Sequence, residues 1–290
     1  MRGLELLDGA AVGVVVDGAG TVLARAEIRA ADLSKAALDV IEQLGNATDG
    51  AIALAASTPE SRGTIAAVEA IAARVGEKRL AAPIPSGTAA AVAEAWVGAA
   101  RGVGDLVFFG AAEHVTAGLL RNGAPRSGAH GHAPAIGWLS LNPVEREDYR
   151  KLGCLQAEVG AAGIVRRLIW RIKAGDESRV KDDVSGDLSA MTVDHVLAAA
   201  RDGDGVAVSV IRDTTKYLGM AAANLAAIVD PEMLVLGGIM AATDLLFDAV
   251  CQEVVRRLPA PMGQNLKIAR AGLGPLGPAI GAARLASVER

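Results

Sequence analysis

The run Val12-Gly13-Val14-Val15-Val16 is followed by Asp17-Gly18-Ala19-Gly20 and then by Val22-Leu23-Ala24-Arg25-Ala26-Glu27-Ile28. Two runs of strand-forming residues around a glycine-rich turn predict a β-hairpin. Leu4 to Leu7 is expected to belong to the first of its strands. Downstream, apolar spacing predicts helices over 34–44, 64–75 and 88–100, with short strands over 52–56 and at Ile84. Strands followed by alternating helices and strands indicate an α/β lobe.

The pattern begins again at Asp105, where 105–109 and 115–120 predict a second hairpin. Beyond it we predict helices over 157–172, 193–201, 206–229, 243–258 and 278–288, strands over 232–236 and 267–271, and an exposed excursion over 173–189. Repetition of one pattern indicates an internal duplication, with a ligand cleft between the two lobes. We expect the first lobe to span 1–102, completed by a C-terminal helix over 275–290, and the second to span 103–274.

Composition narrows the class of protein. Hydrophobic residues make up 51% of the 290 residues, which excludes disorder, but aromatic residues only 3%, so the core must be aliphatic. Cys154 and Cys251 are the only cysteines, and a formal net charge of −4 argues against a nucleic-acid surface. No apolar run is long enough to span a bilayer, and Met1 to Glu5 does not open a secretory signal. We expect a cytoplasmic protein with no membrane or nucleic-acid contact from this chain.

Several glycine-containing segments carry a family resemblance. They are Val14-Val15-Val16-Asp17 with Gly20, Gly98-Ala99-Ala100-Arg101-Gly102, Gly123 with Gly128-Ala129-His130-Gly131, Ile136-Gly137, Gly153-Cys154-Leu155, and Asp230-Pro231-Glu232-Met233-Leu234-Val235-Leu236-Gly237-Gly238. With these segments the chain resembles the ROK family, which groups bacterial sugar kinases with transcriptional repressors. The resemblance implies a duplicated actin-like ATPase (ribonuclease H-like) α/β fold of two lobes with an interlobe cleft.

The phosphate-binding loops that the resemblance implies are altered. The family's first loop, Asp-x-Gly-Gly-Thr, matches 5–9, where Glu5 keeps the carboxylate and Leu7 and Asp8 replace the glycines. The second, Gly-Thr-Gly-x-Gly-x-Gly, matches 112–118, where only the last glycine remains. Asp8 and Glu113 therefore place negative charges where a nucleotide phosphate would lie, and like charges repel.

The catalytic base of the family's sugar kinases is also missing. Those enzymes carry Asn-Asp before an Ala-rich helix, and the Asp deprotonates the sugar hydroxyl, a contribution of ~10²–10⁴ in rate. The matching residues are Ser86 and Gly87, and glycine cannot accept a proton. A divergent kinase would need a relocated base, for which Glu5 or Glu94 is the nearest candidate.

The residues that would read sugar hydroxyls and hold a zinc ion differ as well. The family's Glu-x-Gly-His and the Glu after Gly-Cys-Leu become Ala135, Trp138 and Gln156, of which Gln156 alone could still bind a hydroxyl. The four zinc ligands are matched by Trp138, Glu147, Tyr149 and Cys154, and one probable ligand does not hold zinc. Gly237 and Gly238, which pack near the adenosine in the family, are intact but also have a structural use at the end of a strand.

The four remaining candidates are histidines and their neighbours. His130 and His132 lie two residues apart in a glycine-rich loop and could in principle bind a metal with Cys154 or Glu113, but we favour hydrogen-bonded or solvated imidazoles. Glu113 beside His114 resembles an acid/base pair, although adjacent residues need not face each other, and a solvated loop is the preferred interpretation.

Three functional hypotheses remain. The leading one is a ROK-like protein without sugar kinase activity that acts as a small-molecule-binding, sensing or scaffold module, with no ATP, Mg²⁺ or zinc. The alternatives are a divergent ATP-dependent sugar kinase and the effector domain of a ROK-type regulator. We expect no helix-turn-helix in this chain, because the first predicted strand starts almost at Met1, but a longer gene product would remove this objection. The resemblance also implies a homodimer formed through the second lobe, and a sugar-like ligand.

Overall fold

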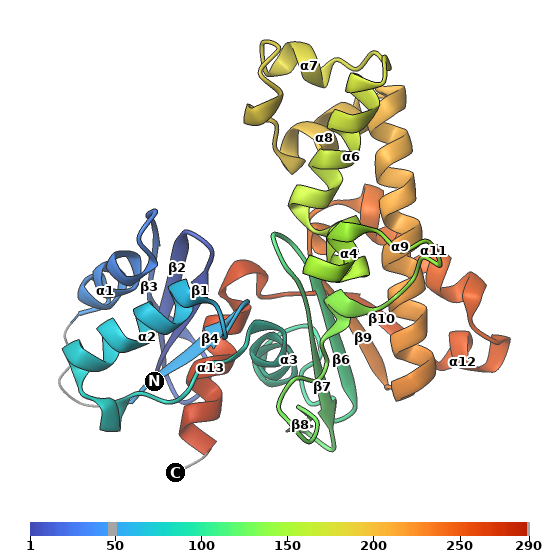
Figure 1. Cartoon of the computed structure of the whole chain (residues 1–290). Helices are drawn as coiled ribbons and strands as arrows, with labels where there is room; N and C mark the ends of the chain where they lie inside the picture. The colour runs from blue at the N-terminus through green and yellow to red at the C-terminus, as the bar shows by residue number, and fades with distance from the viewer. Residues whose placement is uncertain (46–50, 289–290) are drawn as a thin grey trace.

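The computed structural model describes residues 1–45 and 51–288, and it contains two five-stranded mixed sheets with helices (Figure 1). Residues 46–50 of the predicted first lobe and 289–290 of the predicted terminal helix lie outside this range. The first half of the chain contains β1 (Arg2–Leu7), β2 (Ala10–Val16), β3 (Val22–Arg29), α1 (Leu33–Gln43), β4 (Ile52–Ala56), α2 (Arg62–Val75), β5 (Ile84–Pro85) and α3 (Ser86–Val97).

The first sheet has the order β3-β2-β1-β4-β5, and β1 is its central strand. β1 pairs antiparallel with β2 and parallel with β4, so that Glu5 lies between Val12 and Ala55. The prediction that 4–7 continues the first hairpin strand is wrong, because the chain reverses between Leu7 and Ala10. Gly9 permits this tight turn, since its φ of +73° lies in the left-handed region that favours glycine.

The second half repeats this arrangement with the order β10-β9-β6-β7-β8. Its elements are β6 (Leu106–Ala111), β7 (Val115–Arg121), β8 (Ala124–Pro125), α4 (Glu147–Leu152), α5 (Cys154–Val159), α6 (Ala161–Lys173), α7 (Val180–Asp183), α8 (Val193–Arg201), α9 (Gly205–Val229), β9 (Met233–Gly238), α10 (Ile239–Ala242), α11 (Asp244–Arg257), α12 (Ala260–Asn265), β10 (Lys267–Arg270) and α13 (Gly277–Val288). Like β1, β6 pairs antiparallel with the next strand and parallel with a later one. The predicted duplicated α/β fold is confirmed.

Local capping explains where several helices begin and end. The Asp32 carboxylate accepts the Ser34 and Lys35 amides at the start of α1. Asp204 accepts the Ala207 amide at the start of α9, which ends at Asp230 in a left-handed conformation, φ 48°. Such caps satisfy amides that have no partner inside the helix.

Two segments differ from the sequence prediction. The helix predicted over 157–172 is two helices, α5 and α6, separated at Gly160. The predicted excursion over 173–189 contains α7, and Val180 and Val184 are buried in the core of the second lobe. Eight of the 17 residues in this segment are charged, and this hides the apolar signal of Val180 and Val184, which anchor it.

Two helices, one from each half of the chain, pack between the sheets. Alternate residues of a strand face opposite sides of its sheet. The outer face of the first sheet is covered by α1 and α2, and the outer face of the second sheet is covered by the helices of the second half other than α13. The inner face of the first sheet is covered by α13, which contacts β1, β2 and β4. The inner face of the second is covered by α3, whose Ala90, Ala91 and Val92 pack with Leu106 and Phe108. The two halves are therefore interlocked (Figure 1).

The α3–α13 contact is an approach of backbone to backbone. A Cβ added at Gly281 of α13 would lie 1.8 Å from the Ala89 carbonyl oxygen of α3. Ala89 and Ala93 of α3 and Ala279, Ala282 and Ala283 of α13 are all buried in clusters that both helices share. Small residues allow the helices to approach this closely, which explains why α3 is rich in alanine.

No helix within residues 1–45 and 51–288 is both long and apolar enough to cross a membrane.

The helix contact predicts an unequal response of two glycines in α13 to the same substitution. Gly281→Ala should lower the free energy of unfolding by about 2 kcal/mol or more, because overpacking forces the backbones apart. Gly277→Ala is the matched control, since its added Cβ would lie 3.7 Å from Leu273. It should be neutral or stabilising by about 0.5 kcal/mol. Urea denaturation followed by circular dichroism measures both, and equal values would contradict the contact.

Candidate functional site

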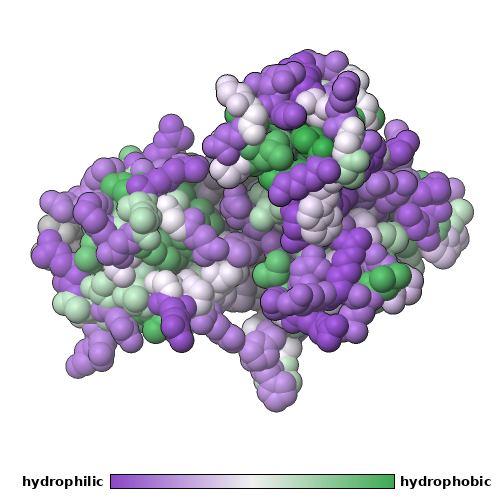
Figure 2. All heavy atoms as spheres, turned by 45° about the horizontal axis from the view of Figure 1, so that its top comes forward, coloured by the Kyte–Doolittle hydropathy of each residue, from purple (hydrophilic) through white to green (hydrophobic). Residues whose placement is uncertain are grey.

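Two hairpin turns meet where the two halves of the molecule face each other. The β1–β2 turn carries Asp8 and the β6–β7 turn carries His114, and the His114 Nε2 atom lies 2.8 Å from the Asp8 Oδ2 atom. The His114 side chain is 24% exposed and that of Asp8 62%. The two altered phosphate loops expected from the sequence thus contact each other directly. Figure 2 shows a notch in the surface between the two lobes.

Gln156 of α5 holds the second turn in place. Its Oε1 atom accepts the Val115 amide at 2.7 Å, and its Nε2 atom donates to the Glu113 carbonyl at 2.9 Å. Both ends of the amide are used by the hairpin, so Gln156 positions His114. The Glu113 side chain is exposed and makes no hydrogen bond or ion pair with any described residue.

Glu5 is a buried acid on β1, the strand that leads into the first turn. Its side chain lies on the inner face of β1, with only 5% of the residue exposed. It shares a hydrogen bond with Ser86, the first residue of α3, and the Ser57 hydroxyl donates to the Ser86 hydroxyl at 3.4 Å. Burial raises the pKa of Glu5 to about 7, although the Ser86 hydrogen bond opposes the shift. Near neutral pH this carboxyl can therefore hold or release a proton.

Gly87 lies where α3 begins and packs directly on β7. A Cβ at Gly87 would be 2.3 Å from the Ala117 carbonyl oxygen and 2.5 Å from the Ala117 nitrogen. A Cβ at Gly118 would in turn lie 2.2 Å from the Gly87 carbonyl oxygen. No side chain fits at Gly87 without separating the helix from the strand, so this position cannot carry a carboxylate in this packing.

Glu94, the other candidate for a relocated base, has a structural role. It is buried, with 1% of the residue exposed, and its carboxylate accepts the amides of Ala99, Gly272 and Leu273 at 2.7, 3.1 and 3.0 Å. The carboxylate joins the end of α3 to the segment that leads into α13. The sequence shows nothing of this use, because the partners lie up to 179 residues away.

The glycine-rich loop over 128–138 is largely exposed. His130 and Ala135 are exposed, and Trp138 is 59% exposed. His132 reaches across to the first lobe, where its Nδ1 atom lies 3.7 Å from the Glu60 Oε1 atom. Among the residues that the structure describes, no group of three or more His, Cys, Asp or Glu side chains could hold a metal ion.

Gly237 and Gly238 at the end of β9 are packed against β6. A Cβ at Gly237 would lie 2.5 Å from the Phe108 ring, and one at Gly238 would lie 1.9 Å from the Ala111 carbonyl oxygen. Gly238 also has a φ of +62°. Both glycines are therefore required by the packing of the sheet. A larger residue at Gly237 would disturb this packing, so its effect would not report on nucleotide binding alone.

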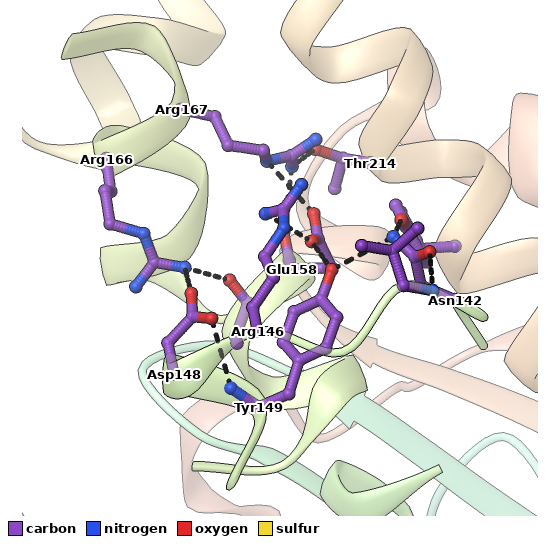
Figure 3. Close-up of polar contacts among 11 residues, drawn as sticks. Asn142, Arg146, Asp148, Tyr149, Glu158, Arg166, Arg167 and Thr214 are labelled. Carbon is purple, nitrogen blue, oxygen red and sulfur yellow. Dashed lines mark hydrogen bonds and ion pairs between the residues drawn. The ribbon is translucent and has the colours of Figure 1, made fainter. Parts of the chain in front are cut away.

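The positions matched to zinc ligands do not form a donor set. Tyr149 is buried and donates its hydroxyl to Glu158 (Figure 3). Trp138 has no suitable donor atom, and Cys154 is buried with apolar neighbours. The residues present do not fit a zinc ion.

A buried polar network, which we call the Glu158 cluster, holds this part of the chain instead. It consists of Asn142, Arg146, Tyr149, Glu158 and Arg167. Arg146 donates to the Glu158 carboxylate at 3.1 Å, Arg167 lies 3.7 Å from it, and Asn142 donates to the Tyr149 hydroxyl at 3.2 Å. Burial, and then Glu158, raise the pKa of Tyr149, which stays protonated. Sequence reasoning missed this cluster, although a Glu flanked by Arg and Tyr within ten residues was a possible signal.

Glu5 predicts a pH-dependent stability. Because its pKa is higher in the folded state, Glu5 stabilises the fold fully below its unfolded pKa, near 4.5, and this stability is lost as pH rises through about 7. The loss should be on the order of 3 kcal/mol. Glu5→Gln should remove this slope, so that the free energy of unfolding of the variant rises relative to that of the wild type between pH 5 and 8. Glu113→Gln is the exposed control. Parallel wild-type and Glu5→Gln curves in urea denaturation would contradict the shift.

Two substitutions, one in the Glu158 cluster and one on the surface nearby, should differ in their effect on the free energy of unfolding. Glu158→Gln leaves the mostly buried Arg167 without its counter-charge and should lower the free energy of unfolding by about 3 kcal/mol. Glu147→Gln removes the exposed pair with Lys151, 81% and 69% exposed, and should change it by less than about 0.5 kcal/mol. Chemical denaturation at pH 7 compares them, and a small effect at Glu158 would show that the cluster is not needed.

Comparison with known proteins places this geometry in a family. A sequence model of the ROK family matches residues 77–289. A glucokinase of Halalkalibacterium halodurans is 32% identical over 167 residues, which cover 57% of this chain and 50% of the relative. The DNA-binding transcriptional dual regulator NagC of Escherichia coli is 28% identical over 185 residues, 63% of this chain and 44% of the relative. The matched regions thus span about half the length of these curated relatives.

The solved structures agree on the fold. A ROK family glucokinase from Streptomyces griseus, in complex with glucose and AMPPNP, superposes with a TM-score of 0.83 at 22% identity, covering 99% of both chains. At this identity the likeness shows the fold alone, which is the actin-like two-lobe architecture expected from the sequence. Since the family model matches most of the chain, this protein belongs to the ROK family.

Proposed function

We propose that this chain is a ROK-family module that binds or senses a small hydroxylated molecule, such as a sugar, without phosphorylating it. The observation that carries the proposal is the contact between Asp8 and His114. It joins the two turns between which the resemblance would place the nucleotide phosphates. A phosphate there would have to separate the turns and would meet the carboxylates of Asp8 and Glu113.

The position of the family's catalytic base supports the same proposal. Gly87 has no proton acceptor, and the Ala117 backbone fills the space that a side chain would need. Of the expected sugar-reading positions, Ala135 and Trp138 are exposed, and Gln156 is engaged by the β6–β7 hairpin. A ligand of this chain would therefore be bound by other groups, and the hydrogen-bonded set of Glu5, Ser57 and Ser86 is the candidate.

The NagC relative favours a sensing role over a purely structural one. The region matched there covers less than half of a DNA-binding regulator, which fits an effector module. In this reading the chain acts in the cytoplasm as a homodimer formed through the second lobe, and neither nucleotide nor zinc is required. Gel filtration with light scattering tests the dimer.

A divergent kinase is the competing proposal, and Glu5 is the candidate base that the geometry leaves to it. Its carboxyl lies beside Ser86 and has a pKa near neutrality, as a general base requires. Glu94 is the weaker candidate, because three backbone amides already engage its carboxylate.

Phosphotransfer and binding assays separate these proposals. With ATP, Mg²⁺ and a panel of hexoses, N-acetylhexosamines and pentoses, we expect no ADP release above the enzyme-free rate, while the Streptomyces griseus glucokinase assayed in parallel turns over. One sugar should raise the melting temperature without ATP, since a ligand that binds only the folded state stabilises it. ATP with Mg²⁺ should not. Sugar-dependent ADP release that Glu5→Gln abolishes would establish the kinase instead.

A further inference from the structure

The strand β3 is the longest open edge of the two sheets in the described part of the chain. It has eight residues, whereas the other edge strands are shorter: β10 has four residues, and β5 and β8 have two each. An edge strand presents unpaired N–H and C=O groups that another strand can bind, and proteins commonly shorten such edges. In Figure 1, β3 lies on the side of the first sheet that faces away from the second lobe.

The backbone groups of β3 point alternately toward β2 and toward the open edge. The Ala30 amide donates to the Gly9 carbonyl at 3.0 Å, so the residue that follows β3 belongs to a hydrogen-bonded pair. Such pairs recur at every second residue of an antiparallel ladder, so the even-numbered residues over 24–28 also bond to β2. The ladder's register shift lies at 15–16 of β2, outside this segment. The odd-numbered residues therefore direct their amides and carbonyls to the open edge, and these are Arg25, Glu27 and Arg29.

The same three residues carry exposed charges that alternate in sign. Arg25 and Glu27 lie opposite Val14 and Val12 on the inner face of the sheet, where α13 covers β1, β2 and β4. The Glu27 carboxylate lies 3.2 Å from the Arg29 guanidinium, with side chains 48% and 82% exposed. Arg25 is exposed and makes no ion pair with a described residue. The edge thus presents a cation without a counter-charge two residues from a carboxylate.

These charges favour one register for the pairing of β3 with β3 of a second copy. When a twofold axis passes at Ala26, Arg25 lies opposite Glu27 of the second copy, and Glu27 lies opposite its Arg25. An axis at Glu27 would place Glu27 opposite itself and Arg25 opposite Arg29, and an axis at Arg25 would place two Arg25 side chains opposite each other. Opposite charges across a strand pair stabilise it, and like charges destabilise it. An axis at Ile28 would pair residues beyond the end of β3.

We propose that β3 pairs antiparallel with β3 of a second copy of this chain, with the axis at Ala26, so that the first sheets of two molecules join into one sheet. The outward backbone groups of 25–29 then gain partners, and each Arg25 gains the Glu27 carboxylate of the other copy. The contact goes beyond the proposed function, since it lies in the first lobe and differs from the second-lobe dimer. Because one short strand buries little surface, the association is weak and depends on concentration.

A disulfide across the axis tests the register. Residues opposite each other in a pair without hydrogen bonds have Cα atoms about 4.5 Å apart, which is within disulfide range. Ala26→Cys in a Cys251→Ser background should therefore form an intermolecular disulfide on mild oxidation, since Cys154 is buried. Ala24→Cys is the matched control. Ala24 is exposed whereas Ala26 is buried, but its own copy would lie about 13 Å away, four residues along the strand. On non-reducing gels, we expect Ala26→Cys to form dimers at least about tenfold faster.

Charge variants test the interaction itself by sedimentation velocity over a range of protein concentrations. Arg25→Glu and Glu27→Arg each place like charges opposite one another at two symmetry-related positions, and each should weaken the association roughly tenfold. The two substitutions together restore opposite charges and should restore the association. Arg74→Glu is the control, since Arg74 is an exposed residue of α2 on the same lobe and undergoes the same change of charge. It should leave the association unchanged.

Two results would overturn the pairing. One is disulfide formation that is no faster in Ala26→Cys than in Ala24→Cys, with both variants folded by circular dichroism. The other is association that Arg25→Glu weakens no more than Arg74→Glu does, or a wild type that does not associate further as its concentration rises. The charge variants decide the question if Ala26→Cys does not fold. Neither measurement involves a sugar or ATP, so failure of the pairing would leave the proposed function standing.

Discussion

The close contact between α3 and α13 is the constraint on which the rest of the structure depends. Gly281 brings α13 to the backbone of α3, and each helix covers the inner face of one sheet. α3 comes from the first half of the chain but covers the second sheet, and α13 comes from the end of the second half but covers the first sheet. The inner face of each sheet is therefore covered only when the other half is present. This packing sets the distance between the sheets and therefore the distance between the two turns that carry Asp8 and His114.

Polar side chains at the junction are largely engaged in holding backbone. Glu94 accepts three amides, and Gln156 is bonded at both ends to the second hairpin. Gly87 is packed so closely on Ala117 that its missing side chain is a condition of the contact between α3 and β7. These positions coincide with ones at which the family resemblance led us to look for chemistry, and here they build the junction. Glu5 differs from them, since it shares a hydrogen bond with a side-chain hydroxyl and has a pKa near neutrality.

The Glu158 cluster also holds a segment of the chain in place, away from the junction. In the segment where the resemblance would place a zinc ion, a buried carboxylate receives Arg146 and the Tyr149 hydroxyl and lies close to Arg167 (Figure 3). Such a network holds a loop only while every member is paired, since an unpaired charge in the interior is strongly destabilising. α4 has only six residues and is held by contacts with α5 and α6. No local pattern in the sequence therefore predicts it.

What the sequence by itself determined is the duplicated architecture and most of its elements, because strand alternation, helical spacing and caps are local properties of the chain. Helices α1, α2, α8, α9, α11 and α13 lie within about two residues of the predicted bounds for this reason. The family resemblance also predicted which positions would surround a cleft. Only the tertiary structure decided how those positions are used. Asp8 and His114 are 106 residues apart, and Glu94 lies 179 residues from Leu273. Their contacts follow from the packing of α3 on α13, which no local pattern encodes.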